Sequence, residues 1–240
     1  MRGPLLVADG IAVRLGDALV LRDVRFEVAA GEVLGVFGPS GAGKSTLFRA
    51  LAGEERLAAG RVLLDGEDAS GLPLWQRARR GLGYLPQTPS VLWDLSVAEN
   101  LAAFRALSPL TTSVGVGGAV DALGLGERLH VRASSLSGGE RRRLELLRAL
   151  SVGPRVLLCD EPFAAVDPVG AARVGAALRA LAASGAAVLI ADHHVAEALE
   201  LCDRAALLLD GEIGAVATPE AFRRHPLVRK HYVALPPSER

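Results

Sequence analysis

The sequence contains little cysteine and no excess charge of either sign. Its 240 residues include two cysteines, Cys159 and Cys202, which stand far apart and without the short spacing of metal ligands. We therefore expect both to be reduced thiols. Lysine plus arginine equals aspartate plus glutamate at 27 each, so the formal net charge is zero. This balance argues against nucleic acid as the main partner, because such proteins concentrate positive charge.

Long apolar segments are missing as well. The most apolar long stretch, residues 174–191, is interrupted by Arg179, Ser184 and Gly185, whereas a membrane-spanning helix needs about 20 apolar residues. Residues 1–5 lack the extended apolar region of a secretory signal peptide. We therefore expect a cytoplasmic protein that reaches a membrane only through partners.

A glycine-rich run lies between a predicted strand at 33–37 and a predicted helix that starts at 47–51. The run fits the pattern G-x-x-x-x-G-K-[ST], a loop whose backbone N–H groups surround the phosphates of a nucleoside triphosphate. Lys44 would reach the β- and γ-phosphates and Ser45 would bind Mg²⁺, so the sequence predicts ATP and Mg²⁺ as ligands. The run consists of Gly38, Pro39, Ser40, Gly41, Ala42, Gly43, Lys44, Ser45 and Thr46.

Two carboxylates, Asp160 and Glu161, follow the apolar residues 156–159. Ligands of an open α/β sheet bind at the carboxyl ends of its strands, which would bring both acids near the phosphates. Asp160 suits Mg²⁺. Because side chains alternate along an extended segment, we expect Glu161 to point elsewhere and to polarise the water that attacks the γ-phosphorus. The alternative, a pair that only caps the next helix, fits less well beside a phosphate loop.

A second glycine pair precedes an arginine-rich predicted helix at 141–150. Ser137, Gly138 and Gly139 at the N-terminus of this helix could hold an anion. Ser137 followed by Glu140 also fits a capping box, in which serine and glutamate satisfy each other's backbone N–H groups. The two interpretations are compatible.

The pattern of the remaining elements favours an α/β protein. Between residues 5 and 37, short apolar runs alternate with turn signals and predict an antiparallel β-rich N-terminal portion. Farther on, helices are predicted at 97–107 and 118–123 with a loop at 108–117, followed by alternating strands and helices typical of a parallel sheet. The short runs are 5–8, 11–15, 19–21 and 24–28, and the alternating segments are 156–159, 171–183, 187–191, 195–201 and 205–209.

Residues 136–140, between the phosphate loop and the two carboxylates, resemble the signature of ABC-transporter ATPase subunits, and the resemblance covers essentially the whole chain. It implies an α/β P-loop NTPase (RecA-like) core with an N-terminal antiparallel β subdomain and an inserted α-helical subdomain. We expect a single domain over 1–240. Residues 1–87 and 151–240 would form the core and β subdomain, and 88–150 the helical subdomain with the signature.

The resemblance assigns further residues. Gln87 matches the glutamine that senses Mg²⁺ and touches the membrane partner, and Asp167 matches the acid at the dimer interface. His193 matches the histidine that contacts the γ-phosphate, with His194 as a solvent-facing neighbour. Leu15 occupies the position where this family usually has an aromatic residue that stacks on adenine, so the stacking contribution of roughly 1 kcal/mol is reduced.

The resemblance also implies partners. Two ATPase subunits of this family meet head to tail, so each ATP lies between one phosphate loop and residues 137–139 of the other subunit. We expect a homodimer that works with two transmembrane permease subunits, which would contact a groove near residues 87–95. Trp93 could anchor that contact, or could simply pack on the rim of the helical subdomain.

Several segments most closely resemble the ATPases of lipopolysaccharide export systems, which implies ATP-driven export from the inner membrane by a protein peripheral on its cytoplasmic face. Trp93 and Asp94, however, stand where basic residues are expected. The alternatives are an ATPase of a branched-chain amino-acid importer, a soluble ABC ATPase in DNA repair or translation, and a subunit that binds nucleotide with little turnover. The segments that carry the resemblance are 72–87, 136–143, 161–168 and 228–232.

Overall fold

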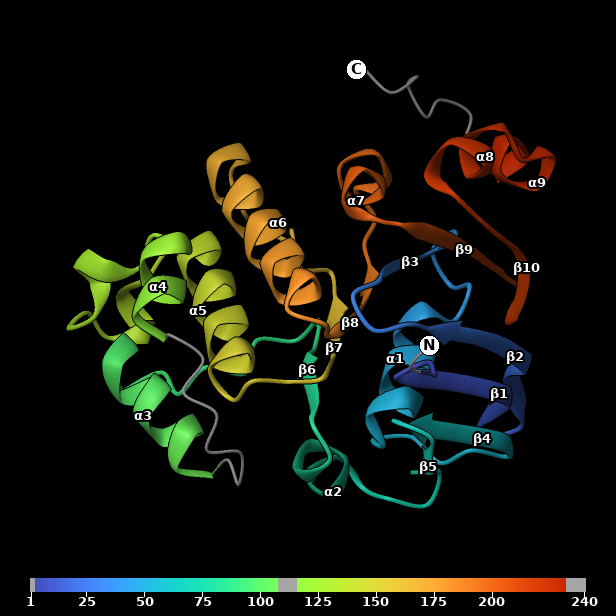
Figure 1. Cartoon of the computed structure of the whole chain (residues 1–240), viewed down its shortest axis with the longest axis horizontal. Helices are drawn as coiled ribbons and strands as arrows, with labels where there is room; N and C mark the ends of the chain where they lie inside the picture. The colour runs from blue at the N-terminus through green and yellow to red at the C-terminus, as the bar shows by residue number, and fades with distance from the viewer. Residues whose placement is uncertain (1–2, 108–115, 232–240) are drawn as a thin grey trace.

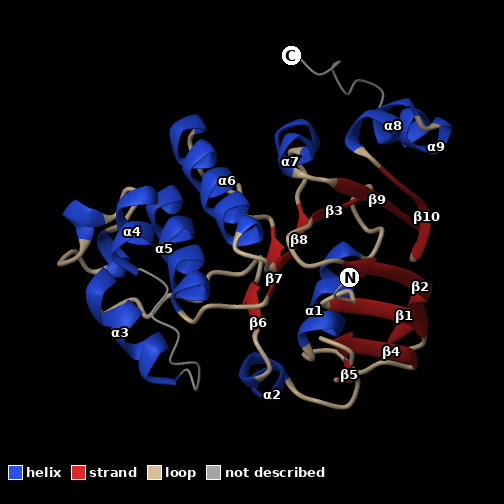
Figure 2. Cartoon of the chain, viewed as in Figure 1, coloured by secondary structure: helices blue, strands red, loops and turns tan. Residues whose placement is uncertain are grey.

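A computed structural model describes residues 3–107 and 116–231. It contains two sheets, a larger one in the middle of the molecule and a smaller one beside it (Figures 1 and 2). The strands of the larger sheet are β3 (Val33–Phe37), β6 (Leu82–Leu85), β7 (Val156–Asp160), β8 (Ala187–Ala191), β9 (Arg204–Leu209) and β10 (Glu212–Ala217). Their order is β10-β9-β3-β8-β7-β6, with β10 antiparallel to β9 and the other pairs parallel. β3, β7 and β8 are buried along their whole length, as in sheets covered on both faces.

The smaller sheet is antiparallel and has the order β2-β1-β4-β5. Its strands are β1 (Leu6–Leu15), β2 (Ala18–Val28), β4 (Ala59–Leu64) and β5 (Glu67–Asp68). The predicted antiparallel β portion is confirmed, but two of the turn signals do not end a strand, because β1 and β2 each run through one of them. Gly10 and Asp23, with φ of 67° and 47°, lie where the register shifts. Each marks a β-bulge, which adds a residue and bends a strand without ending it.

Some helices lie next to the larger sheet, and others form a separate group at one side of it. In Figure 1, α3, α4 and α5 lie together on the left, and the antiparallel sheet lies on the right. The helices are α1 (Lys44–Ala52), α2 (Leu74–Arg79), α3 (Val97–Leu107), α4 (Val116–Ala122), α5 (Gly138–Ser151), α6 (Pro168–Ala183), α7 (Val195–Leu201), α8 (Pro219–Arg224) and α9 (Pro226–His231). Short 3₁₀ turns lie at Gly126–Arg128 and Ala133–Ser135. The predicted architecture of a parallel core, an antiparallel β portion and helices inserted between β6 and β7 is confirmed.

Two predicted boundaries differ from the structure. Helix α4 begins at Val116, so the predicted loop at 108–117 ends earlier, and its first eight positions, 108–115, lie outside the described residues. Helix α6 begins at Pro168 rather than 171, because Asp167 caps it and proline is favoured in the first turn of a helix. Within residues 3–107 and 116–231, no helix is both long and apolar enough to cross a bilayer.

The two faces of β3 belong to different parts of the core. Val33 and Phe37 pack with the helices on one face, where the Phe37 and Phe222 rings lie 5.6 Å apart. Leu34 and Val36 face the other way and join a cluster that includes α1 and the antiparallel sheet. Because α1 packs against both sheets, the loop between β3 and α1 is held firmly at both ends.

Arg77 of α2 is buried, with 1% of its surface exposed, and binds the end of α1. Its guanidinium donates hydrogen bonds to the carbonyl oxygens of Ala50 and Leu51 at 2.9 and 2.6 Å, and to those of Ser70 and Leu72 at 3.0 and 2.9 Å. Burial lowers the pKa of Arg77 to about 10, so it stays charged at neutral pH. One side chain therefore satisfies several carbonyls that would otherwise be buried without partners.

Replacing Arg77 with leucine should lower the free energy of unfolding by about 3 kcal/mol or more, because these carbonyls would lose their donor. Urea denaturation followed by circular dichroism measures this effect. The exposed Arg79 on the same helix provides the matched control, since Arg79→Leu should change stability by less than about 1 kcal/mol. Equal losses from the two substitutions would contradict the capping role.

Candidate functional site

The loops after β3, β8, β7 and β6 leave the larger sheet at one edge, because these neighbouring strands are parallel. The loop after β3 is the glycine-rich run. The loops after β7 and β8 carry Glu161 and residues 192–194, and the loop after β6 carries Gln87. The topology therefore brings four predicted segments to the same end of the sheet.

The glycine-rich run turns directly into α1. Gly43 is the N-cap of α1 with φ of 103°, a conformation that favours glycine, and a Cβ at this position would meet Leu21 at 2.9 Å. No side chain caps this end of α1, so the N–H groups of its first turn remain available to an anion. The geometry is that of a phosphate-binding loop.

Lys44 folds back over this loop. Its Nζ donates hydrogen bonds to the carbonyl oxygens of Gly38 and Pro39 at 2.6 and 3.1 Å. Burial lowers the pKa of Lys44, while Asp160 first and then other acids at the strand ends act in the opposite direction. The lysine thus lies within electrostatic reach of the carboxylates that follow β7 and β8.

Asp160 ends β7 and is buried, with 2% of its surface exposed. Burial raises its pKa, and a hydrogen bond from the Ser45 hydroxyl has the opposite effect. A hydroxyl and a carboxylate are oxygen ligands of the kind that Mg²⁺ takes, so the residues present fit this ion. Gln87 is exposed on the loop after β6, and within the described residues no hydrogen bond joins it to Ser45 or Asp160.

Glu161 lies just beyond β7 in the left-handed region, with φ of 57°. The expected alternation of side chains along an extended strand therefore does not apply to it. Its N–H donates to the carbonyl oxygen of Ala191 at 2.7 Å, and its Oε2 lies 3.6 Å from Nδ1 of His193. A non-glycine residue in this region costs of order 1–3 kcal/mol, and such strain concentrates at functional sites.

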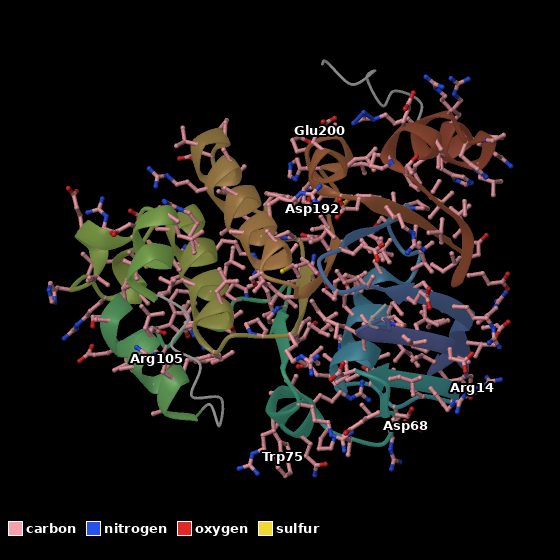
Figure 3. The ribbon with its side chains drawn as sticks, in the orientation of Figure 1. Arg14, Asp68, Trp75, Arg105, Asp192 and Glu200 are labelled. Carbon is pink, nitrogen blue, oxygen red and sulfur yellow. The ribbon has the colours of Figure 1, made fainter. Side chains whose placement is uncertain are left out.

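The segment after β8 begins with a buried aspartate, which Figure 3 labels where β8 leads toward α7. Asp192 accepts hydrogen bonds from the N–H groups of Phe163 at 3.1 Å and His194 at 2.9 Å. The His193 side chain is 55% exposed beside Glu161. His194 is 47% exposed, as expected for a solvent-facing neighbour, but its Nδ1 also lies 3.1 Å from Oδ1 of Asp192.

Arg142 of α5 is a buried residue whose role the sequence analysis missed. Its guanidinium donates to the carbonyl oxygens of Asp160, Glu161 at 3.1 Å and Pro86 at 2.8 Å, and to Oε2 of Glu145 at 2.9 Å. One side chain thereby joins α5 to the ends of β7 and β6. No signal in the sequence distinguished Arg142 from its neighbours, because it is the middle residue of a run of three arginines.

The N-terminus of α5 has the predicted capping box. The N–H of Glu140 donates to Oγ of Ser137 at 3.2 Å, and the N–H of Ser137 donates to Oε2 of Glu140 at 2.9 Å. Ser137 is exposed. A Cβ on Gly139 would lie 3.0 Å from the Ala165 carbonyl oxygen, and one on Gly138 would lie 3.3 Å from Cβ of Ala165. Small residues are therefore needed where α5 approaches the segment before α6.

Three residues for which the sequence predicts contacts with nucleotide or a partner lie at exposed positions. Asp167 caps α6 by accepting a hydrogen bond from the N–H of Gly170 at 2.6 Å. Leu15 ends β1 and is 40% exposed. Trp93 is 47% exposed, and the guanidinium carbon of Arg141 lies 5.4 Å from the centre of its ring.

Hydrogen bonds attach the loop 87–95 to α5. The N–H of Ser90 donates to Oε1 of Glu145 at 2.5 Å, and Arg148 donates to the Ser90 carbonyl oxygen at 2.7 Å. Glu145 also holds Arg142, as described above. The loop after β6 and the end of β7 are therefore tied to the same helix.

Comparisons with known proteins agree with one another. Residues 21–164 match the family model described as ABC transporter. Over 232 residues the chain is 41% identical to the lipopolysaccharide export system ATP-binding protein LptB of Acidithiobacillus ferridurans, covering 95% of this chain and 96% of that protein. The corresponding protein of Escherichia coli (strain K12) is 40% identical with the same coverage. A solved ATP-binding cassette of an ABC transporter, MJ1267 in its ADP conformation, has a TM-score of 0.85 at 25% identity, covering 96% of this chain and 99% of that one.

Proposed function

The chain belongs to the ABC transporter family of ATPases, and from this premise we propose that its ATP hydrolysis powers export of lipopolysaccharide from the inner membrane. The observation that carries the proposal is the likeness to LptB proteins at 41% and 40% identity over 95% of the chain. That length includes the phosphate loop, the signature and the three strand ends with their polar residues. The protein would lie on the cytoplasmic face of the membrane, bound through its partners.

The phosphate loop, residues 38–46, would bind the β- and γ-phosphates through its N–H groups and Lys44. Ser45 and Asp160 would hold Mg²⁺, and Gln87 would complete this site from the loop after β6. When bound, the ion would neutralise negative charge on the phosphates. The lowering effect of the Ser45 hydroxyl on the pKa of Asp160 supports this assignment, because it requires the two side chains to lie close together.

Glu161 would polarise the attacking water, and His193 would contact the γ-phosphate. The distance of 3.6 Å between Oε2 of Glu161 and Nδ1 of His193 supports a shared task. Arg142 would act as a positioning residue, since it holds the carbonyl oxygens of Asp160 and Glu161 rather than substrate.

We propose a homodimer in which Ser137, Gly138, Gly139 and Glu140 of one copy face the ATP on the other, with Asp167 at the same interface. The exposure of Ser137 and Asp167 supports this arrangement. Two transmembrane permease subunits would contact the groove near residues 87–95. The exposed Trp93 on that loop, and the bonds that tie the loop to α5, support a contact that senses the nucleotide site.

The test is purification of the chain with its membrane partners, followed by reconstitution into lipid vesicles. Lipopolysaccharide in the vesicles should stimulate ATP hydrolysis, whereas leucine, isoleucine and valine should not. Stimulation by these amino acids would favour the importer. Recovery on ribosomes or DNA without any membrane protein would contradict a transport role altogether.

Replacing Leu15 with tyrosine should tighten ATP binding about fivefold, because aromatic stacking on the base is worth roughly 1 kcal/mol. Isothermal titration calorimetry of ATP measures the effect, with Leu15→Val as the aliphatic control. An unchanged dissociation constant for Leu15→Tyr would show that the adenine does not lie over this position.

A further inference from the structure

Two adjacent histidines and a buried aspartate gather between β8 and α7. Oδ1 of Asp192 lies 3.7 Å from Nδ1 of His193 and 3.1 Å from Nδ1 of His194. A ligand atom from each of the three residues lies within 4.8 Å of the other two. The centres of the two imidazole rings are 4.0 Å apart. Two ring nitrogens and a carboxylate oxygen therefore converge from one short segment.

The two distances from Asp192 are close to those between the ligands of a tetrahedral metal ion. With metal–ligand bonds of about 2.0–2.1 Å, two ligand atoms of a tetrahedron lie about 3.3–3.4 Å apart. The distances from Asp192 to the two histidines lie on either side of this value. The half-exposed histidine rings can turn to adjust, while Asp192 is fixed by the N–H of Phe163.

A further carboxylate, outside this group of three, lies beside His193. Oε2 of Glu161 lies 3.6 Å from Nδ1 of His193, again close to a tetrahedral edge. Oδ1 of Asp192 accepts a hydrogen bond from the N–H of His194 and also lies 3.1 Å from the ring Nδ1 of His194, a contact that a shared metal ion would replace. A carboxylate oxygen has a second lone pair that could bind a metal.

We propose that Asp192, His193 and His194 bind a divalent transition-metal ion, Zn²⁺ in particular, with Glu161 or water as the fourth ligand. Imidazole nitrogen together with carboxylate oxygen is a donor set that Zn²⁺ takes readily, whereas Mg²⁺ prefers oxygen ligands alone. The site therefore differs in chemistry from the oxygen donors of Ser45 and Asp160.

A functional consequence rests on the proposed function. An ion bound here fixes the ring of His193, which removes this ring from ATP. Zn²⁺ therefore inhibits hydrolysis by competing for the histidine that would contact the γ-phosphate.

The binding test uses the full chain without an affinity tag or nucleotide, titrated with Zn²⁺ by calorimetry. The wild type should bind one ion per chain at this site, and His194→Asn should weaken that binding about tenfold or more. His194 is the N-cap of α7 without a side-chain cap bond, and asparagine is a favoured N-cap, so α7 should persist in the variant. His130→Asn, which removes an exposed histidine from another part of the chain, should bind Zn²⁺ as the wild type does.

The inhibition test measures ATP hydrolysis at buffered free Zn²⁺, with each variant compared with its own zinc-free rate. Half-inhibition of His194→Asn should need about tenfold more Zn²⁺ than half-inhibition of the wild type. Equal Zn²⁺ binding by wild type and His194→Asn overturns the site. Binding without inhibition overturns the inhibitory role. Absence of hydrolysis in zinc-free wild type overturns the proposed function instead, and the calorimetry still decides the site.

Discussion

Replacing Glu161 with glutamine should lower the rate of ATP hydrolysis by at least about 100-fold while ATP still binds. Glutamine keeps the size of the side chain but cannot take a proton from water, and general-base catalysis contributes about 10²- to 10⁴-fold. The phosphate loop and Lys44 are unchanged, so nucleotide affinity should stay close to that of the wild type. Because cleavage would no longer release the γ-phosphate, the ATP-bound homodimer should accumulate.

Two measurements check this result. Phosphate release reports turnover, and analytical ultracentrifugation with and without ATP reports the dimer. Glu197→Gln, at an exposed position on α7, is the matched control and should hydrolyse ATP at the wild-type rate. Rapid turnover by Glu161→Gln would disprove the assignment of the base. Failure of the variant to dimerise in ATP would count against the head-to-tail arrangement.

Replacing His193 with alanine should also remove most activity, by about 100-fold. A positioned donor to a group that gains charge in the transition state is typically worth 10²- to 10³-fold. His193 is placed for this task by its exposure and by its distance of 3.6 Å from Oε2 of Glu161. Steady-state hydrolysis at saturating ATP should show the loss in kcat.

His194→Ala separates the two adjacent histidines. The hydrogen bond from the His194 N–H to Asp192 comes from the backbone, so alanine retains it. We expect the zinc-free turnover of this variant to stay within a few-fold of the wild type. If His194→Ala lost activity and His193→Ala did not, the assignment would be displaced by one residue.

Local patterns predicted the parts of the site that depend on short segments. The phosphate loop requires glycine where the backbone enters α1, and Gly43 has that conformation. The capping box at Ser137 and Glu140 is a contact over three residues, and the structure confirms it. The order of apolar segments after residue 156 predicted parallel strands, which in turn brought the polar residues at their ends to one edge.

Contacts between distant residues could not be predicted in the same way. Arg77 and Arg142 look like surface arginines in the sequence, yet each is buried against carbonyl groups from segments far along the chain. The conformation of Glu161 depends on its hydrogen bond to Ala191 and overrides the expected alternation. The bulges at Gly10 and Asp23 depend on the partner strand. Residue types such as glycine and aspartate occur both in bulges within strands and in turns that end strands, so the sequence alone does not separate the two.

Helix α5 has a further consequence for how such a protein can evolve. The helix is roughly 20 Å long, and the signature residue Ser137 caps its exposed N-terminus. Farther along it, Arg142 binds the Pro86 carbonyl oxygen and Glu145 binds the N–H of Ser90 in loop 87–95. In the proposed complex, adaptation of that loop to a new permease would shift this helix and alter the rate of phosphate cleavage. Cargo choice and catalytic speed should therefore change together across descendants, with compensating substitutions gathered along this one helix.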